Sequence, residues 1–214
     1  MAIILDHIFI ITKPDAPEGD RLADIGLREG NSNTHSGQGT SNRRFFTDGF
    51  TIELLFVSDA IEAANGAGRQ LGILNRSKNT NASPFGIVVR VDDVKTTPDF
   101  PNWPYFPDYF PSPMCFYVGD NSDKLEEPLC ICMPPGLPKS RGVPDQYANP
   151  DWQLTELKIQ VPATEFSATL SQFSSMSNVT IFPGQAHRMI LIFNNAIAGR
   201  SVDMLPDLPL IVEW

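Results

Sequence analysis

Cysteine is scarce in this sequence. Its 214 residues include only three cysteines, Cys115, Cys130 and Cys132. An odd number of cysteines without C-x-x-C spacing does not fit a disulfide framework, a redox pair or a zinc knuckle. We therefore interpret all three as thiols of the hydrophobic core, in a protein of a reducing compartment.

The N-terminus lacks both a basic leader and a long apolar run. Its first residues read MAIILDH, so the apolar stretch is interrupted at once by Asp6 and His7. Neither a secretory signal nor a membrane span fits this pattern. We therefore expect a cytoplasmic protein.

Clusters of basic residues are also missing. Lysine and arginine number 16 against 25 acidic residues, which gives a net charge of -9, and the longest basic run is Arg43-Arg44. Binding to a phosphate backbone or an anionic membrane depends on clustered lysine and arginine. The composition therefore argues against nucleic acid and membrane partners and favours small molecules.

The apolar residues that are present, 42% of the chain, suffice for a buried core. Residues 3–11 form a predicted strand with alternating faces, Leu5, His7 and Phe9 on one and Asp6, Ile8 and Ile10 on the other. A helix is predicted over residues 18–25, followed by strands over 42–47 and 50–57. The dipeptide Asp48-Gly49 between these strands predicts a tight hairpin turn. The first block, residues 1–58, therefore has the order strand, helix, strands.

Two further blocks follow a helical connector at residues 59–84. The second, 85–137, begins with an apolar strand at 86–91 and continues with a proline- and aromatic-rich segment at 98–110, where regular helix is excluded. We interpret that segment either as an extended cover over a sheet or as a pocket lid. The third block, 151–214, returns to the first order. The sequence thus predicts an α+β protein of repeated β-α-β-β-β modules in one compact domain.

Three landmarks of the first block have counterparts in the third at similar spacing. Leu5-Asp6-His7 corresponds to Leu154-Thr155-Glu156, Gly37-Gln38-Gly39 to Gly184-Gln185-Ala186, and Ile52-Glu53-Leu54 to Val202-Asp203-Met204. Their common order indicates an internal duplication. If both blocks descend from one module, we expect Glu156 and Asp203 to occupy adjacent strands, as we expect of His7 and Glu53.

His7 and Glu53 are the candidates for chemistry. Each interrupts an otherwise apolar predicted strand, where a polar group needs a partner. Adjacent strands would bring the imidazole and the carboxylate onto one divalent ion, of zinc, iron, manganese or nickel. The alternative is a hydrogen-bonded His-Glu pair inside a barrel.

A family resemblance supports the metal interpretation. The segments LDHIFI at residues 5–10, HSGQGTSNR at 35–43 and FTIELL at 50–55 together resemble the first module of glyoxalase-like proteins of the vicinal oxygen chelate superfamily. The resemblance is specific over about the first sixty residues. It implies paired β-α-β-β-β modules that curl into half-open barrel sheets with peripheral helices. It also implies that His7 and Glu53 are metal ligands and that a carboxylate, for which Glu53 is our candidate, acts as the base.

The segment that begins at His35 is similar to the family signature His-x-Gly-x-Gly-Thr-x-Asn. The resemblance implies that His35, Thr40 and Asn42 bind substrate at the mouth of the barrel. The alternative is a glycine-rich turn with a surface histidine.

The sequence does not decide whether the second module or the third block pairs with the first module. If the second module pairs with it, Gly86 replaces the first-strand ligand and the last strand offers only Cys130 or Cys132, which favours a binding protein. If the third block pairs with it, Glu156 and Asp203 complete an oxygen-rich set suited to manganese, magnesium or iron.

Two functions follow from the resemblance. The first is a metal-dependent enzyme of isomerase, lyase or dioxygenase type that acts on a small oxygenated substrate, with manganese, iron, zinc or nickel and no organic cofactor. The second is a non-catalytic small-molecule-binding protein with a degenerate metal site. Modules of this kind pair within one chain or between two, so a homodimer is a further option.

Overall fold

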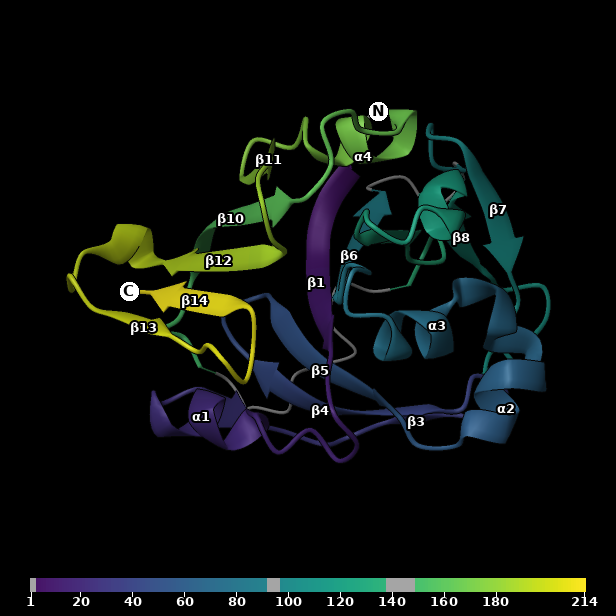
Figure 1. Cartoon of the computed structure of the whole chain (residues 1–214), viewed down its shortest axis with the longest axis horizontal. Helices are drawn as coiled ribbons and strands as arrows, with labels where there is room; N and C mark the ends of the chain where they lie inside the picture. The colour runs from purple at the N-terminus through teal and green to yellow at the C-terminus, as the bar shows by residue number, and fades with distance from the viewer. Residues whose placement is uncertain (1–2, 92–96, 138–148) are drawn as a thin grey trace.

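The structure, a computed structural model, describes residues 3–91, 97–137 and 149–214 (Figure 1). Within these ranges the strands form two sheets, one of nine strands and one of five. Each helix in the same ranges is too short or too polar to cross a membrane. The α+β class that the sequence predicts is confirmed.

The first module begins at the N-terminal strand. Its elements are β1 (Ile3–Ile11), α1 (Gly19–Asp24), β2 (Arg28–Glu29), β3 (Thr34–His35), β4 (Thr40–Phe46) and β5 (Thr51–Val57). The last strand, β5, runs parallel to β1 and lies beside it, while β4 pairs with the other edge of β5. The tight connection from β4 to β5 falls at Asp48 and Gly49, the dipeptide that predicted it.

The second module repeats the strand arrangement of the first. Its elements are β6 (Phe85–Val91), β7 (Asn102–Tyr105), β8 (Phe116–Gly119), the 3-10 helix η2 (Asp120–Asp123) and β9 (Leu129–Cys132). Again the last strand, β9, lies parallel beside the first, β6. Antiparallel pairing of β1 with β6 joins the modules into one sheet of order β2-β4-β5-β1-β6-β9-β8-β7. The second module, rather than the third block, therefore completes the sheet that the first module begins.

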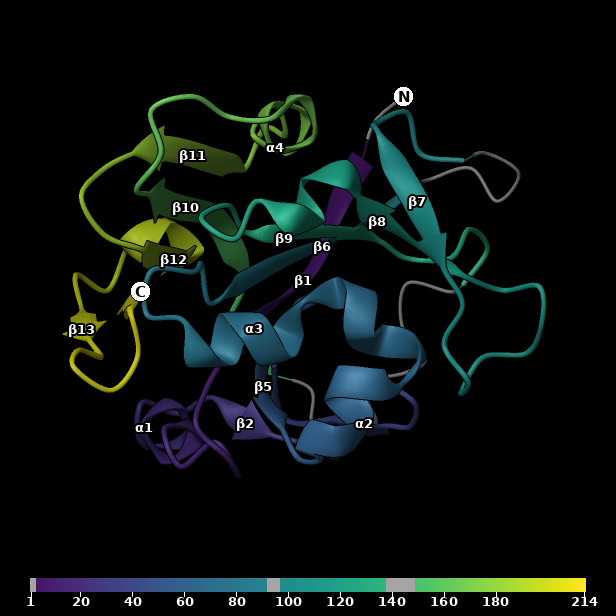
Figure 2. The ribbon, with the colours of Figure 1, turned by 45° about the vertical axis from the view of Figure 1, so that its right-hand side comes forward.

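Three short helices connect the two modules. They are α2 (Ala60–Asn65), the 3-10 helix η1 (Ala67–Leu71) and α3 (Ile73–Lys78), and they lie together in front of β5 in Figure 2. The carboxylate of Asp59 caps α2 by accepting hydrogen bonds from the backbone N–H groups of Ile61 and Glu62. Gly72, with φ of +69°, separates η1 from α3. The predicted helical connector is therefore present as three pieces.

The third block forms the five-stranded sheet. Its elements are β10 (Leu154–Val161), α4 (Ala168–Phe173), β11 (Val179–Pro183), β12 (Arg188–Phe193), the 3-10 helix η4 (Asn194–Ala196), β13 (Ser201–Asp203) and β14 (Leu210–Glu213). The strand order is β11-β10-β12-β14-β13, because the strand after α4 pairs in parallel with β10. In the first two modules the strand beside the first one is instead the last. The block therefore differs in strand order from the module that its sequence resembles.

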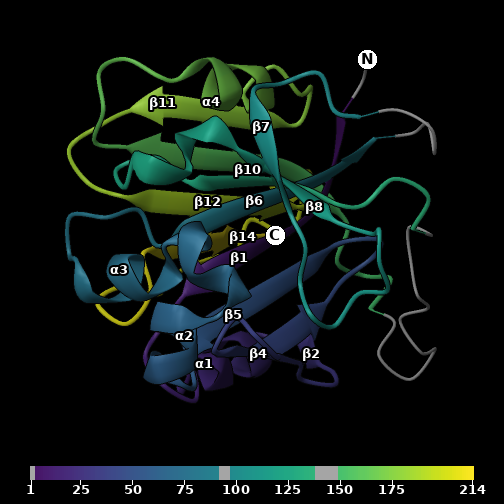
Figure 3. The same cartoon turned by 90° about the vertical axis from the view of Figure 1, so that its right-hand side faces the viewer.

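The two sheets pack face to face. One large cluster of buried apolar residues joins Ile8, Ile52 and Ile87 of the first sheet with Leu157 and Leu191 of the second. Figure 3 shows β10 above β6 and β1, with α2 of the connector and α1 of the first module toward the bottom of the view. The opposite face of the first sheet is left to form a cavity.

A β-bulge sets which side chains of β1 face that cavity. The pairing of β1 with β6 shifts register between Leu5 and His7, so Asp6 is an extra residue. Asp6 and His7 consequently both line the cavity, while Leu5 is buried in the core between the sheets. Strict alternation, which placed Leu5 with His7 and Asp6 opposite, is therefore wrong at these two positions. A similar shift occurs in β10 between Leu154 and Glu156.

Candidate functional site

The free face of the first sheet forms a cavity of about 520 Å³, here called the barrel cavity. Its floor and walls are mainly apolar and aromatic. They include Phe9, Leu55, Leu71, Ile73, Val88, Tyr105, Tyr109, Phe110, Phe116, Leu129, Ile131 and Met133. Polar side chains gather at one part of its lining. They include Asp6, His7, His35, Gln38, Arg44, Glu53 and Arg90. An apolar pocket with a few grouped polar atoms is the usual form of a small-molecule site.

His7 and Glu53 enter the same cavity from neighbouring strands. In the parallel pairing of β1 and β5, His7 lies opposite Thr51, and Glu53 is two residues further along β5. Residues two apart on a strand share a face. Accordingly His7, Thr51 and Glu53 all line the barrel cavity. The structure thus brings together the two residues that the sequence singled out.

The ring of His7 is held by an acidic neighbour. Its Nδ1 lies 2.6 Å from Oδ1 of Asp6, and Asp6 accepts a second bond of 2.6 Å from Nε of Arg90. Because an ionised carboxylate only accepts, Nδ1 carries the hydrogen and Nε2 is left as the ring atom for a ligand.

Burial and charge act in opposite directions on this pair. Burial alone would lower the pKa of His7, but the hydrogen bond to Asp6 and the charge of Glu53 outweigh it, so the pKa is raised. Burial alone would raise the pKa of Asp6, yet His7 and Arg90 together lower it. Both shifts stabilise the ionised pair in the cavity wall.

Glu53 is the unpaired member of the site. Its carboxylate makes no hydrogen bond or ion pair with any residue that the structure describes, although Ile52 and Leu54 beside it are fully buried. A half-buried carboxylate without a protein partner is available to a donor on a bound molecule.

His35 lines the cavity, whereas Thr40 and Asn42 are buried outside its lining. Nδ1 of His35 lies 3.0 Å from Oγ1 of Thr40, which also accepts a 2.8 Å bond from Nε2 of Gln38. Burial lowers the pKa of His35, which favours the neutral ring near pH 7. Thr40 and Asn42 are buried and absent from the cavity lining, and Asn42 binds the backbone N–H of Asn33 instead.

The glycines of this motif serve the packing of α2. The carboxylate of Glu62 accepts hydrogen bonds from the backbone N–H groups of Gly37 and Gly39, at 2.8 and 2.9 Å. Gly39 has φ of +69°, and a Cβ there would lie 2.4 Å from the backbone of Asp59 and Ala63. The turn therefore needs glycine at this position for structural reasons.

The second module offers no counterpart to His7 and Glu53. Ile8 of β1 lies opposite Ile87 of β6 where the two modules join. His7 directly precedes Ile8 and Gly86 directly precedes Ile87, so Gly86 holds in the second module the place that His7 holds in the first. Gly86 pairs with Leu129 as His7 pairs with Thr51, which gives Ile131 the place of Glu53. The prediction that Gly86 replaces the first-strand ligand in the second module agrees with this register.

The expectation that Cys130 or Cys132 occupies the last-strand position is wrong. Both thiols are fully buried in the core between the sheets, and the intervening Ile131 faces the cavity. Alternation along β9 puts the cysteines on the opposite face. With Cys115 also buried and free, the interpretation of all three as core thiols agrees with the structure.

The ring of Phe9 fills the space beside Gly86. A Cβ on Gly86 would lie 2.0 Å from Cε1 and Cζ of that ring, so no larger side chain fits there. Within the described ranges, no three His, Cys, Asp or Glu side chains are grouped to hold a metal. The residues present therefore do not form a complete ligand set for a divalent ion.

Glu156 and Asp203 do not join this site. They lie on β10 and β13, which are separated by two strands, so the expectation of adjacent strands is wrong. Glu156 pairs with Lys158 at 3.1 Å and Asp203 pairs with Arg188. Neither carboxylate lines the barrel cavity.

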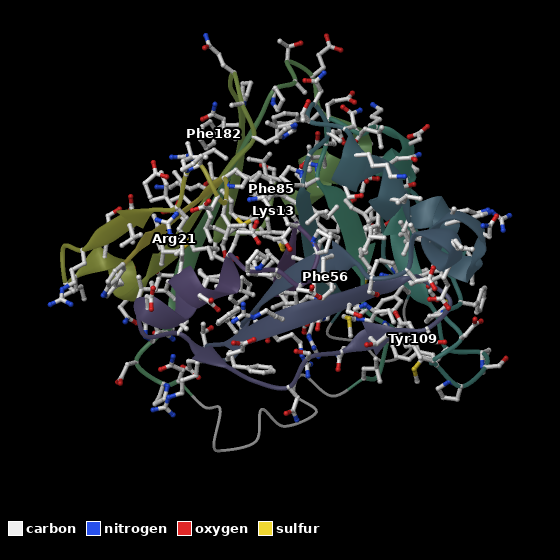
Figure 4. All side chains as sticks on the ribbon, turned by 60° about the horizontal axis from the view of Figure 1, so that its bottom comes forward. Lys13, Arg21, Phe56, Phe85, Tyr109 and Phe182 are labelled. Atoms are coloured by element: carbon white, nitrogen blue, oxygen red, sulfur yellow. The ribbon has the colours of Figure 1, made fainter. Side chains whose placement is uncertain are left out.

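The aromatic segment covers the cavity. Tyr109, labelled in Figure 4, lies with its ring centre 5.6 Å from that of His35, and its hydroxyl is 3.5 Å from Oε1 of Gln38. Burial raises the pKa of Tyr105 to about 12 and raises that of Tyr109 as well, so both stay neutral donors. The pocket-lid interpretation of residues 98–110 agrees with this placement better than a cover without a cavity.

The polar lining residues that sequence reasoning missed include Asp6, Gln38, Arg44 and Arg90. Arg44 on β4 lies opposite Glu53 on β5, a backbone register that a sequence alone does not give. Asp6 was assigned to the other face because the bulge was not foreseen.

Comparisons with known proteins bear on the fold. No protein-family model matches the sequence, and no curated protein is significantly similar to it. A hypothetical protein from Staphylococcus aureus of known structure matches 99% of this chain and 99% of its own, with 15% identity and a TM-score of 0.60. The methylmalonyl-CoA epimerase of Mycobacterium tuberculosis matches 63% of this chain and 89% of its own, with 14% identity and a TM-score of 0.40. The first likeness extends over the whole chain and establishes a shared fold, and the second is too weak to carry an argument.

The glyoxalase-like fold that the resemblance implies is confirmed at the level of architecture. Two modules with the same strand order join through their first strands in one curved sheet. Fold alone does not fix an activity.

Proposed function

We propose that this chain is a small-molecule-binding protein of the glyoxalase-like fold, with a metal site that lacks its second half. The observation that carries the proposal is the replacement of His7 and Glu53 by Gly86 and Ile131 in the second module. Phe9 occupies the space where a ligand side chain would stand. The alternative function predicted from the sequence is therefore the better supported one.

The lining of the cavity defines the class of ligand. The apolar surface of β6 and β9 and the rings of Tyr105, Tyr109 and Phe116 suit an aromatic or aliphatic body. The unengaged atoms at the polar part, Nε2 of His7 and the carboxylate of Glu53, suit a hydroxyl or amine on that body. A volume of about 520 Å³ is within the usual range for a small organic molecule.

A second candidate is proton transfer on the bound molecule, as in an isomerase. The favouring observation is the pairing of His7 with Asp6, which fixes the ring and leaves Nε2 toward the cavity. The carboxylate of Glu53, the base expected from the sequence, would remove a proton from a carbon next to a carbonyl. Protonated Nε2 of His7 would donate a proton to the other face of the same carbon, which leaves Glu53 protonated and His7 neutral.

The experiment that separates these functions begins with metal analysis of protein purified without added metal or chelator. A stoichiometric divalent metal would contradict the binding-protein proposal and restore the metal-dependent lyase, isomerase or dioxygenase predicted from the sequence. Deuterium uptake from D₂O by candidate ketones, lost in Glu53→Gln, would favour the isomerase instead.

Ligand binding is tested with the fluorescent probe 1-anilinonaphthalene-8-sulfonate. We expect Ile131→Glu to weaken probe binding at least about tenfold, because it puts a charge in the apolar half of the cavity. Ile61→Glu is the matched control, since Ile61 is 78% exposed on α2. Equal binding by the two variants would place the probe outside the cavity. The homodimer stays a prediction, to be checked by sedimentation.

A further inference from the structure

A second hollow lies where the first module, the segment after α3 and the third block meet. It has a volume of about 940 Å³ and is here called the lateral groove. Its polar lining residues include Lys13, Glu18, Arg76, Glu126, His187 and Asp207. It shares no lining residue with the barrel cavity. Lys13 and Tyr109, which line the groove and the cavity respectively, lie well apart in Figure 4.

Glu18 is a buried carboxylate with one unused oxygen. The residue is 5% exposed, and Oε2 has no hydrogen-bond partner. Oε1 lies 3.7 Å from Nζ of Lys13, whose side chain is 68% exposed. A distant and solvated ammonium compensates a buried carboxylate poorly.

His187 offers a second unused acceptor. Its Nε2 lies 3.1 Å from the carbonyl oxygen of Asn81, so Nε2 carries the hydrogen. Burial lowers the pKa of His187, which favours the neutral ring. Nδ1 then presents a lone pair, and this buried atom has no partner.

The guanidinium of Arg76 is a buried cation in the lining of the groove. It is 3% exposed, and its two terminal nitrogens donate to backbone carbonyls, including those of Leu125 and Glu127 at 3.1 and 2.7 Å. Its Nε remains an unused donor. Asp207 is paired with Arg21 of α1 at 3.0 Å. Among the buried side-chain atoms of its described lining, the groove therefore has two unused acceptors, on Glu18 and His187, and one unused donor, on Arg76.

We propose that the lateral groove is a second binding site, which takes a small organic amine. Its ammonium group binds the carboxylate of Glu18, and a further N–H or O–H group of the same molecule donates to Nδ1 of His187. A hydroxyl oxygen on the ligand would accept from Nε of Arg76. This site goes beyond the proposed function, because no residue of the barrel cavity takes part.

Titration calorimetry with spermidine tests the proposal, with sorbitol as the uncharged comparison. We expect spermidine to bind and sorbitol not to bind. Glu18→Gln should weaken spermidine binding at least about tenfold, because a hydrogen bond between charged groups is lost. His187→Phe keeps a ring beside Phe85 and should weaken binding by a smaller factor.

Glu165→Gln is the matched control for overall charge, because Glu165 is exposed and lies outside the groove. It should bind spermidine as the unmodified protein does. Equal loss in Glu18→Gln and Glu165→Gln would mean that spermidine is held only by the net charge of the protein, and the proposal would be wrong. Absence of spermidine binding at millimolar concentration, or equal binding of sorbitol, would also overturn it.

Thermal unfolding of the ligand-free variants separates a binding role from a structural one. If Glu18 serves a ligand, Glu18→Gln should be at least as stable as the unmodified protein, because a buried charge is removed. A lower melting temperature in Glu18→Gln would instead assign Glu18 to holding the fold together.

Discussion

The two modules of the first sheet have the same strand order and opposite chemistry. In the first module the cavity-facing positions hold His7 and Glu53, and in the second the equivalent positions hold Gly86 and Ile131. The comparison shows that a repeated architecture fixes where side chains point and leaves their chemical nature free. One half of the cavity is built to engage a polar group, and the other half is built to pack.

The largest expected effect comes from a substitution in the apolar half of the cavity. Gly86→Val should lower the free energy of unfolding by about 3 kcal/mol, because its side chain overlaps the ring of Phe9. The measurement is urea denaturation. In the background of Phe9→Ala the same substitution should have a much smaller effect. An equal loss in both backgrounds would mean that Phe9 is not what excludes a side chain at Gly86.

The second largest effect comes from a substitution in the polar half of the cavity. Asp6→Asn should lower the free energy of unfolding by about 2 kcal/mol near pH 5, because Arg90 and His7 lose a charged acceptor.

The pH dependence follows from the directions of the two shifts. The pKa of His7 is raised above 6.5, so its contribution is complete below pH 6.5 and is lost as pH rises through the folded-state pKa. The pKa of Asp6 is lowered below 3.8, so its contribution is present above pH 3.8 and is lost as pH falls through the lowered value. Denaturation between pH 3 and 8 should therefore show a maximum for the unmodified protein that is flattened in Asp6→Asn. A retained maximum would contradict the role of the pair.

A smaller effect tests whether the hydroxyl of Thr40 positions His35. Thr40→Val should lower the free energy of unfolding by about 1.5 kcal/mol, because Gln38 and His35 lose a buried partner. Thr34→Val is the control, since Thr34 is exposed and its hydroxyl lies 3.2 Å from that of Ser41. Equal stability of the two variants would show that Thr40 is not needed to place His35.

The smallest effect distinguishes binding from stability. Glu53→Gln should change the free energy of unfolding by no more than about 0.5 kcal/mol, because Glu53 makes no hydrogen bond or ion pair within the described part of the chain. It should nevertheless lower the pKa of His7, which the charge of Glu53 helps to raise. NMR titration of the His7 ring measures this shift. An unchanged pKa would mean that the two groups do not interact.

Local pattern predicted the first module well. The strand over residues 3–11 matches β1, and the Asp48-Gly49 turn between β4 and β5 is present, because both depend on alternation and on turn preference within a few residues. The same reasoning missed β11 and β14. Their parallel pairing with β10 and β12 is decided by packing between distant parts of the chain.

The sequence predicted several residues of the candidate site, but it predicted their arrangement in space only in part. His7, Glu53 and His35 line one cavity, while Thr40 and Asn42 lie behind it. Arg90 and the second module's contribution became visible only with the register of β1 on β6. Spacing along a sequence does not encode the register between strands that are eighty residues apart.

The bulge in β1 has a consequence for how such a cavity can change over time. Leu5 and His7 would face opposite sides of the sheet if they were consecutive, so Asp6 is an addition that leaves the phase of both flanking segments intact. A single-codon insertion can therefore bring a charge into the cavity wall without turning any core residue outward. Removal of the same codon would withdraw that charge and still leave His7 in place. The strand thus tolerates an insertion or deletion at the one position where polarity of the cavity is adjusted.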